Sequence, residues 1–171
     1  MQNPRVPVRP GLGGGKANTI PMEVNFENKT KALDWNELSF NWLRTVKVLI
    51  HEKQPGDIIV HMLHQAIENS FKAVYAYYGL SIPKKTSMET LYKFTLSKID
   101  AFEQISLDKL ETISKLYQNN QSPGPNYRVP EKDSIQQFYT LTGNINTIVS
   151  LFIMNLPQRT ININQREKQS P

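Results

Sequence analysis

The most constraining feature of the sequence is a long stripe of apolar residues between Asp133 and Leu156. Its members recur at steps of three and four: Ile135, Phe138, Leu141, Ile145, Ile148, Phe152 and Leu156. Such steps place these side chains on one face of an α-helix, which must be buried against other elements. Gly143 lies inside this predicted helix at a cost of about 1 kcal/mol relative to Ala. We therefore expect another helix to approach closely at Gly143.

Four earlier segments show the same helical periodicity. Each begins at a residue that can cap a helix: Asp34 for 34–52, Asp57 for 57–78, Ser87 for the third segment and Ser106 for the fourth. The connections at Pro55-Gly56 and near Pro83 are short, which favours antiparallel neighbours. The sequence therefore predicts an all-α fold, an up-and-down bundle of about five helices.

The two ends of the chain are expected to be flexible arms around one domain at 34–156. Residues 1–33 are rich in Pro and Gly, and residues 157–171 begin with Pro157. The net charge of +5 comes from these ends, because acidic and basic residues balance within 34–156. The basic arms are either solvated tails or weak, salt-sensitive contacts with a phosphate backbone. An interaction protein whose arms touch DNA is one alternative.

The composition excludes several classes of protein. The chain of 171 residues has no Cys, so disulfides, thiolate metal sites and a Cys nucleophile are excluded. No stretch approaches the roughly 20 apolar residues that a membrane-spanning helix needs. No apolar stretch follows the first residues, as a secretory signal would require. We expect a cytoplasmic protein with no membrane partner.

The connection between the fourth and fifth predicted helices, residues 118–132, is long and has no periodicity. Such a loop is either a functional element or a disordered insertion. It contains Tyr127 and Arg128, an aromatic ring beside a planar cation, a pair that suits phosphate binding or base stacking. Anchoring of the loop is the alternative role for this pair.

The second predicted helix and the loop after it carry a distinctive pattern. It reads Gln-Ala-x-Glu-x-x-x-Lys-Ala, then Gly, then Pro-x-Lys-Thr, here Gln65, Ala66, Glu68, Lys72, Ala73, Gly79, Pro83, Lys85 and Thr86. This pattern resembles the HEPN domain family, and so do Trp42-Leu43 and the segment 127–130. The resemblance spans about 34–156. It implies a helical bundle that dimerises, with a nucleotide or RNA as ligand or a partner protein such as a nucleotidyltransferase.

Many members of this family cleave RNA without a metal through an Arg-x(4–6)-His motif near the start of the last helix. In this chain, the positions that would hold the His after Arg128 are Asp133, Ser134 and Ile135. All three His residues precede the last helix. We therefore expect no catalytic residue, no cofactor and no metal. An RNA-cleaving toxin of a toxin–antitoxin pair, with a rearranged site, is the alternative.

The expected ligand-binding residues are Gln65, Glu68, Lys72, Tyr127 and Arg128. Glu68 and Lys72 are four residues apart, in the order that favours an ion pair on a helix, so a structural role is the alternative. The sequence predicts a dimeric binding or regulatory module that holds a nucleotide, RNA or protein near the second helix and the long loop.

Two weaker patterns carry alternatives. His61, His64 and Glu68 share a helix face and are either three zinc ligands or an ordinary polar face. Arg44 and His51 match the spacing of the ribonuclease motif, but they lie in the first predicted helix. We interpret them as a solvated pair rather than as a catalytic one.

Overall fold

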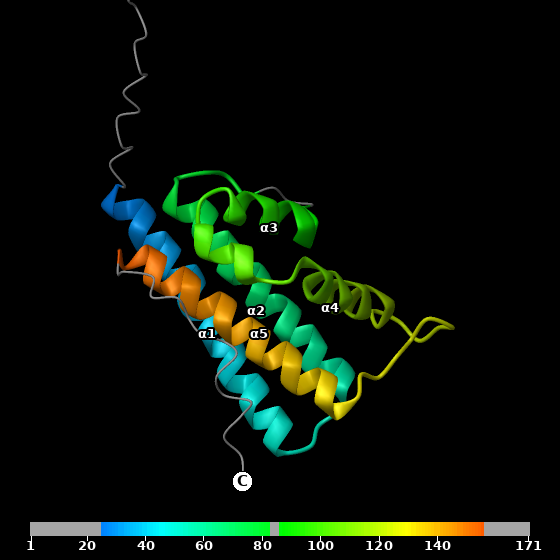
Figure 1. Ribbon diagram of the computed structural model, residues 1–171. Helices are drawn as coiled ribbons and strands as arrows, with labels where there is room; N and C mark the ends of the chain where they lie inside the picture. Colours follow the sequence, from blue (N-terminus) through cyan, green and yellow to red (C-terminus); the bar gives the residue numbers. More distant parts are fainter. Residues whose placement is uncertain (1–24, 83–85, 156–171) are drawn as a thin grey trace, which may run out of the picture.

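A computed structural model describes residues 25–82 and 86–155 of the chain. The described residues form five α-helices and one short 3-10 helix, with no strand among them (Figure 1). The elements are α1 (Phe26–His51), α2 (Gly56–Tyr77), α3 (Met88–Leu96), η1 (Asp100–Gln104), α4 (Leu107–Asn119) and α5 (Lys132–Ile153). The predicted all-α bundle is confirmed. None of the described helices is both long enough and apolar enough to cross a bilayer.

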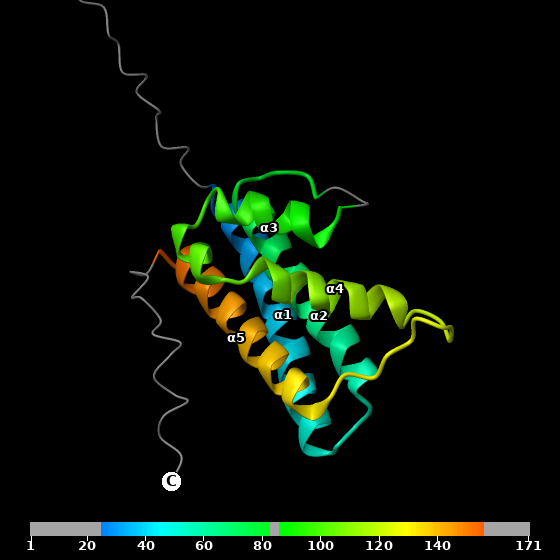
Figure 2. The same ribbon diagram turned by 45° about the vertical axis from the view of Figure 1, so that its right-hand side comes forward.

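Three long helices, α1, α2 and α5, pack side by side and enclose most of the core (Figure 1). The short turn at 52–55 makes α1 and α2 antiparallel, as the sequence predicts, whereas α5 runs in the same direction as α2 (Figures 1 and 2). This direction is possible because α3, η1 and α4 carry the chain back along the side of α2 before α5 begins. The 3-10 helix η1 is not anticipated by the sequence pattern.

The first helix begins earlier than predicted. Its N-cap is Asn25, whose Oδ1 accepts a hydrogen bond from the backbone N–H of Glu27 at 2.9 Å, and not Asp34. Ala32 is fully buried in the core, and Lys31 pairs with Glu27 at 2.6 Å. Residues 26–33, which were assigned to a flexible arm, are therefore helical because tertiary packing and a local cap extend α1. Of the two predicted arms, 1–33 and 157–171, residues 1–24 and 157–171 lie outside the described residues.

The second helix is buried on most of its sides and forms the centre of the bundle. The predicted cap at Asp57 is wrong: Pro55 is the N-cap, and Asp57 lies in the first turn of α2 with its carboxylate turned to the long loop. Gly79 follows the helix with a φ of 67°, the left-handed conformation that glycine adopts readily. A Cβ at Gly79 would also lie 2.6 Å from Nδ2 of Asn28.

The caps of the two shorter helices agree with the sequence. The Ser87 side chain accepts a hydrogen bond from the backbone N–H of Thr90 at the start of α3. The Ser106 side chain accepts one from the backbone N–H of Lys109 at the start of α4. Both follow the usual N-cap pattern, which satisfies an amide left free by the first helical turn.

A buried polar network joins α1, α2 and α5. Asn146 of α5 donates from Nδ2 to Oδ1 of Asn36 at 3.3 Å and to Oγ of Ser39 at 3.1 Å. Asn36 in turn donates to Oγ of Ser150 at 2.8 Å, and Ser39 and Ser70 share a hydrogen bond of 2.8 Å. Because buried polar groups are costly when unpaired, these bonds fix how the three helices face one another.

Gly143 does not have the packing role predicted for it. A Cβ built at this position would meet no atom within 4 Å, so no other helix approaches it closely. The expectation of a close contact at Gly143 is wrong. The glycine is a local weak point of α5 rather than a contact site.

Candidate functional site

Two of the predicted residues on α2, Glu68 and Lys72, form an ion pair with each other. The pair lies on the face of α2 between α1 and α4. Lys72 and Glu68 pair through Nζ and Oε1 at 2.6 Å, and both side chains are largely buried. The Lys72 ammonium also lies 5.1 Å from the ring centroid of Trp35 on α1, a cation–π contact. Gln65 lies half-buried on the same helix. The structure therefore brings Glu68 and Lys72 together, with Trp35 as a partner that sequence spacing could not supply.

His64 lies on the same face of α2, on the side of α4. We call His64, Glu68 and Lys72 the polar stripe of α2. Its imidazole stacks on the ring of Tyr117, with centroids 3.9 Å apart and planes 5° from parallel. Nδ1 of His64 is buried, makes no hydrogen bond and lies 3.9 Å from Oε2 of Glu68. Burial disfavours the charged form and lowers the pKa of His64 to about 4, although the Glu68 charge acts in the opposite direction. The imidazole is therefore neutral near pH 7.

The long loop is held to the body at Tyr127. The Tyr127 hydroxyl donates to Oδ2 of Asp57 at 2.6 Å, and this bond raises the pKa of Tyr127 above its ordinary value. The side chain of Asn120 holds the backbone of Arg128, the residue after Tyr127. The Asn120 amide donates to the carbonyl of Arg128 at 2.7 Å and accepts from the Arg128 backbone N–H at 3.0 Å. The contacts around Tyr127 are those of a loop anchor.

The guanidinium of Arg128 is engaged within its own loop. Its Nη1 donates to the carbonyl oxygens of Pro125 and Tyr127, at 3.0 and 2.9 Å. These two bonds direct the cation toward the loop backbone, although the residue as a whole is exposed.

The predicted site residues lie in two separate groups. Tyr127 contacts Asp57 in the first turn of α2, whereas Gln65 and Lys72 lie further along the same helix. At 1.5 Å per residue, Gln65 is about 12 Å and Lys72 about 22 Å from Asp57 along the axis. Figure 2 shows the loop at the end of the molecule where α2 begins. The predicted residues on α2 and the pair Tyr127 and Arg128 therefore lie at different places along α2.

The two weaker patterns do not assemble into sites either. His61 and His64 both face Tyr117, and no group of three His, Asp or Glu side chains within residues 25–82 and 86–155 could hold a metal ion. Arg44 lies over the ring of Phe40 at 4.8 Å, while exposed His51 pairs with Glu52 at 2.9 Å. Arg44 and His51 thus have separate partners.

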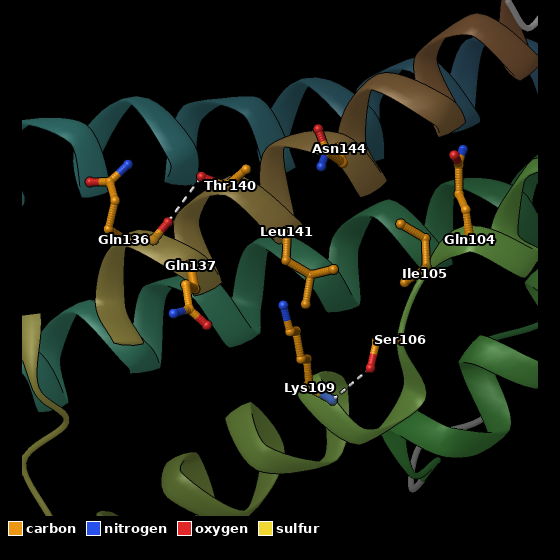
Figure 3. Close-up of a pocket in the computed structure, with 9 residues that line it drawn as sticks. All are labelled: Gln104, Ile105, Ser106, Lys109, Gln136, Gln137, Thr140, Leu141 and Asn144. Atoms are coloured by element: carbon orange, nitrogen blue, oxygen red, sulfur yellow. Dashed lines mark hydrogen bonds between the residues drawn. The ribbon is translucent and has the colours of Figure 1, made fainter. Parts of the chain in front are cut away.

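The structure contains a groove, lined mostly by polar residues, that the sequence did not predict. It lies between α5, η1 and the start of α4, and its volume is about 230 Å³ (Figure 3). Seven polar residues line it, four of them with carboxamide side chains: Gln104, Ser106, Lys109, Gln136, Gln137, Thr140 and Asn144. Buried Leu141 and Ile105 form the apolar part of the lining. In the sequence, the exposed polar residues of α5 opposite its apolar face were the one indication of this groove. The contributions of η1 and α4 to the lining depend on the tertiary fold.

Residues 32–151 match the family model of the HEPN domain. The chain belongs to the HEPN domain family. No curated protein and no solved structure matches it significantly. The resemblance seen in the second helix is thus confirmed, and the match covers all of α2 and most of α1 and α5.

This HEPN domain departs from the ribonuclease members at the His that ends their motif. Arg128 precedes α5, but the first residues of that helix provide Asp133 and Ser134 where the motif requires His. Pro83 and Lys85, which belong to the family pattern that follows the second helix, lie outside the described residues.

Proposed function

We propose that this HEPN domain is a dimeric binding and regulatory module without ribonuclease activity of its own. The observation that carries the proposal is the missing His after Arg128. Cleavage of RNA without a metal needs a group that accepts or donates a proton beside the scissile phosphate. Neither Asp133 nor Ser134 replaces an imidazole that titrates near neutral pH.

The environment of Arg128 supports the same proposal. Its guanidinium already donates to two carbonyl oxygens of its own loop, and the Asn120 side chain holds its backbone. Both bonds use Nη1, one of the three guanidinium nitrogens, to hold the backbone of the loop. The contacts of Arg128 favour a structural role in closing the loop.

The carboxamide-lined groove supports a protein as the ligand rather than a nucleotide or RNA. A carboxamide donates and accepts hydrogen bonds in one plane, as a peptide group does. Sites for single-stranded nucleic acid usually combine aromatic stacking platforms with several cations. The described lining of this groove has no aromatic residue and a single cation, Lys109. The amides match an extended peptide, and Lys109 would favour an acidic residue within it.

The expected partner is a protein such as the nucleotidyltransferase found beside many HEPN domains, and the expected location is the cytoplasm. The partner and the homodimer rest on the family, and the location rests on the composition of the chain.

The test uses the full chain labelled with ¹⁵N, whose side-chain amide signals report directly on Gln137 and Asn144. The probes are a blocked Ala-Asp-Ala peptide, AMP and a uridine oligonucleotide. We expect the peptide alone to shift these signals and the oligonucleotide to stay intact. Asn144→Ala should abolish the response, whereas Gln118→Ala, at an exposed amide elsewhere on α4, should keep it. Shifts with AMP or RNA alone would make a nucleotide the ligand, and cleavage would support the toxin alternative.

A further inference from the structure

The outer face of α1 exposes apolar side chains that the bundle leaves uncovered. Leu33, Phe40 and Val48 are 39%, 45% and 58% exposed. At 100° per residue these three positions fall within about 80° of one another around the helix axis. Exposed apolar residues that share one face of a helix can form an interaction surface when a partner covers them together.

Two opposite charges lie on the same stripe. Glu37 and Arg44 are exposed and, at seven residues apart, nearly aligned along the helix. Within the part of the chain that the structure describes, neither forms an ion pair. Arg44 lies over the ring of Phe40 at 4.8 Å, so its cation is held along the stripe. An acidic and a basic group therefore stand on the stripe without a charged partner in the same copy.

The stripe is complementary to itself when reversed. If a second α1 is laid antiparallel on the first, with the twofold axis between Phe40 and Asn41, Leu33 comes level with Val48 of the other copy. In the same register Glu37 comes level with Arg44. A twofold axis repeats each contact, which gives two apolar pairs and two ion pairs around the two Phe40 rings. Helices pack at 8–10 Å between axes, close enough for these side chains to meet.

We propose that α1 is the homodimer interface of this HEPN domain, with the two copies of α1 antiparallel and Glu37 of each copy paired with Arg44 of the other. This inference rests on the homodimer of the proposed function and names its surface. A second copy is favoured over another partner because the charges and apolar residues of the stripe match their own reverse.

The test measures the dimer dissociation constant of the full chain by sedimentation or light scattering. Glu37→Arg gives a stripe with cations only, and Arg44→Glu one with anions only. Each should weaken the homodimer about tenfold or more, because like charges then meet twice. An equal mixture of the two variants should form a heterodimer, since both ion pairs are then restored. Glu103→Arg in η1, at an exposed position away from α1, is the matched control and should leave the constant unchanged.

The outcomes separate the two claims. Circular dichroism should show that all variants keep their helices, because the substituted side chains are exposed. A wild-type dimer that neither Glu37→Arg nor Arg44→Glu weakens would overturn the interface and leave the proposed homodimer standing. A wild-type chain that stays monomeric at every accessible concentration would overturn both.

Discussion

The imidazole of His64 and the phenol ring of Tyr117 lie face to face, 3.9 Å apart and within 5° of parallel. This stack joins the central helix α2 to α4, and the ring of His61 adds a tilted contact to Tyr117 at 5.1 Å. The polar stripe of α2 is therefore covered by aromatic rings from both neighbours, Tyr117 on one side and Trp35 on the other.

Removal of the Tyr117 ring should loosen α4. An aromatic pair contributes about 0.5–1.5 kcal/mol beyond its buried area, so Tyr117→Ala should lower the free energy of unfolding by about 1–3 kcal/mol. Urea denaturation followed by circular dichroism measures this change. Tyr117→Phe keeps the ring and should retain most of the stability. A loss as large for Phe as for Ala would show that the stack contributes little.

The stability of the domain should depend on His64 at mildly acidic pH. Burial lowers its pKa to about 4 in the folded chain, whereas an unfolded His titrates near 6.5. The unfolded state therefore takes up the proton first as the pH falls. The stabilisation by neutral His64 is complete above about pH 6.5 and declines by up to about 1.4 kcal/mol per pH unit toward pH 4.

This pH dependence is measured as a difference between variants, since carboxylates also titrate in the same range. Unfolding free energies at several pH values between 7 and 4 should fall less steeply for His64→Phe than for the wild type. His51→Gln, at an exposed position at the end of α1, is the control and should keep the wild-type slope. Equal slopes for His64→Phe and the wild type would contradict the neutral buried imidazole.

The polar network should be sensitive to Asn146. Asn146→Leu removes the donor to Asn36 and Ser39 and leaves their buried oxygens with fewer partners. Leaving buried polar groups unpaired costs about 1–3 kcal/mol, and we expect a loss of unfolding free energy in this range. The neighbouring Thr147 is exposed, so Thr147→Ala should change stability by less than about 0.5 kcal/mol. An unchanged free energy of unfolding for Asn146→Leu would mean that apolar packing can replace the network.

Two glycines should respond in opposite ways to alanine. Gly143 lies inside α5 with open space around it, so Gly143→Ala should stabilise the domain by up to about 1 kcal/mol. Gly79 has a φ of 67° and lies against Asn28, so Gly79→Ala should destabilise it. Thermal unfolding of the two variants checks both signs. A destabilising Gly143→Ala would indicate a contact at this helix that the fold does not contain.

The sequence predicts those parts of the fold that depend on local pattern. The five helices, the caps at Ser87 and Ser106 and the Glu68–Lys72 pair follow from periodicity and spacing alone. The start of α1 was missed because it depends on the burial of Ala32, a tertiary contact.

The same distinction explains what was missed at the candidate sites. Trp35 and Tyr117 reach the α2 stripe from helices distant in sequence, and Asn36 and Asn146 meet across 110 residues. The carboxamide-lined groove needs η1, α4 and α5 at once. Nothing in the local pattern near Arg128 indicates that its guanidinium would bond to its own loop.

Incubation of the full chain with end-labelled single-stranded RNA, in EDTA so that contaminating metal-dependent nucleases are inactive, tests the central claim most directly. We predict that the RNA stays intact with the wild type and equally with Arg128→Ala, because the His that would complete the motif is absent. RNA cleavage by the wild type that is lost in Arg128→Ala would contradict the account.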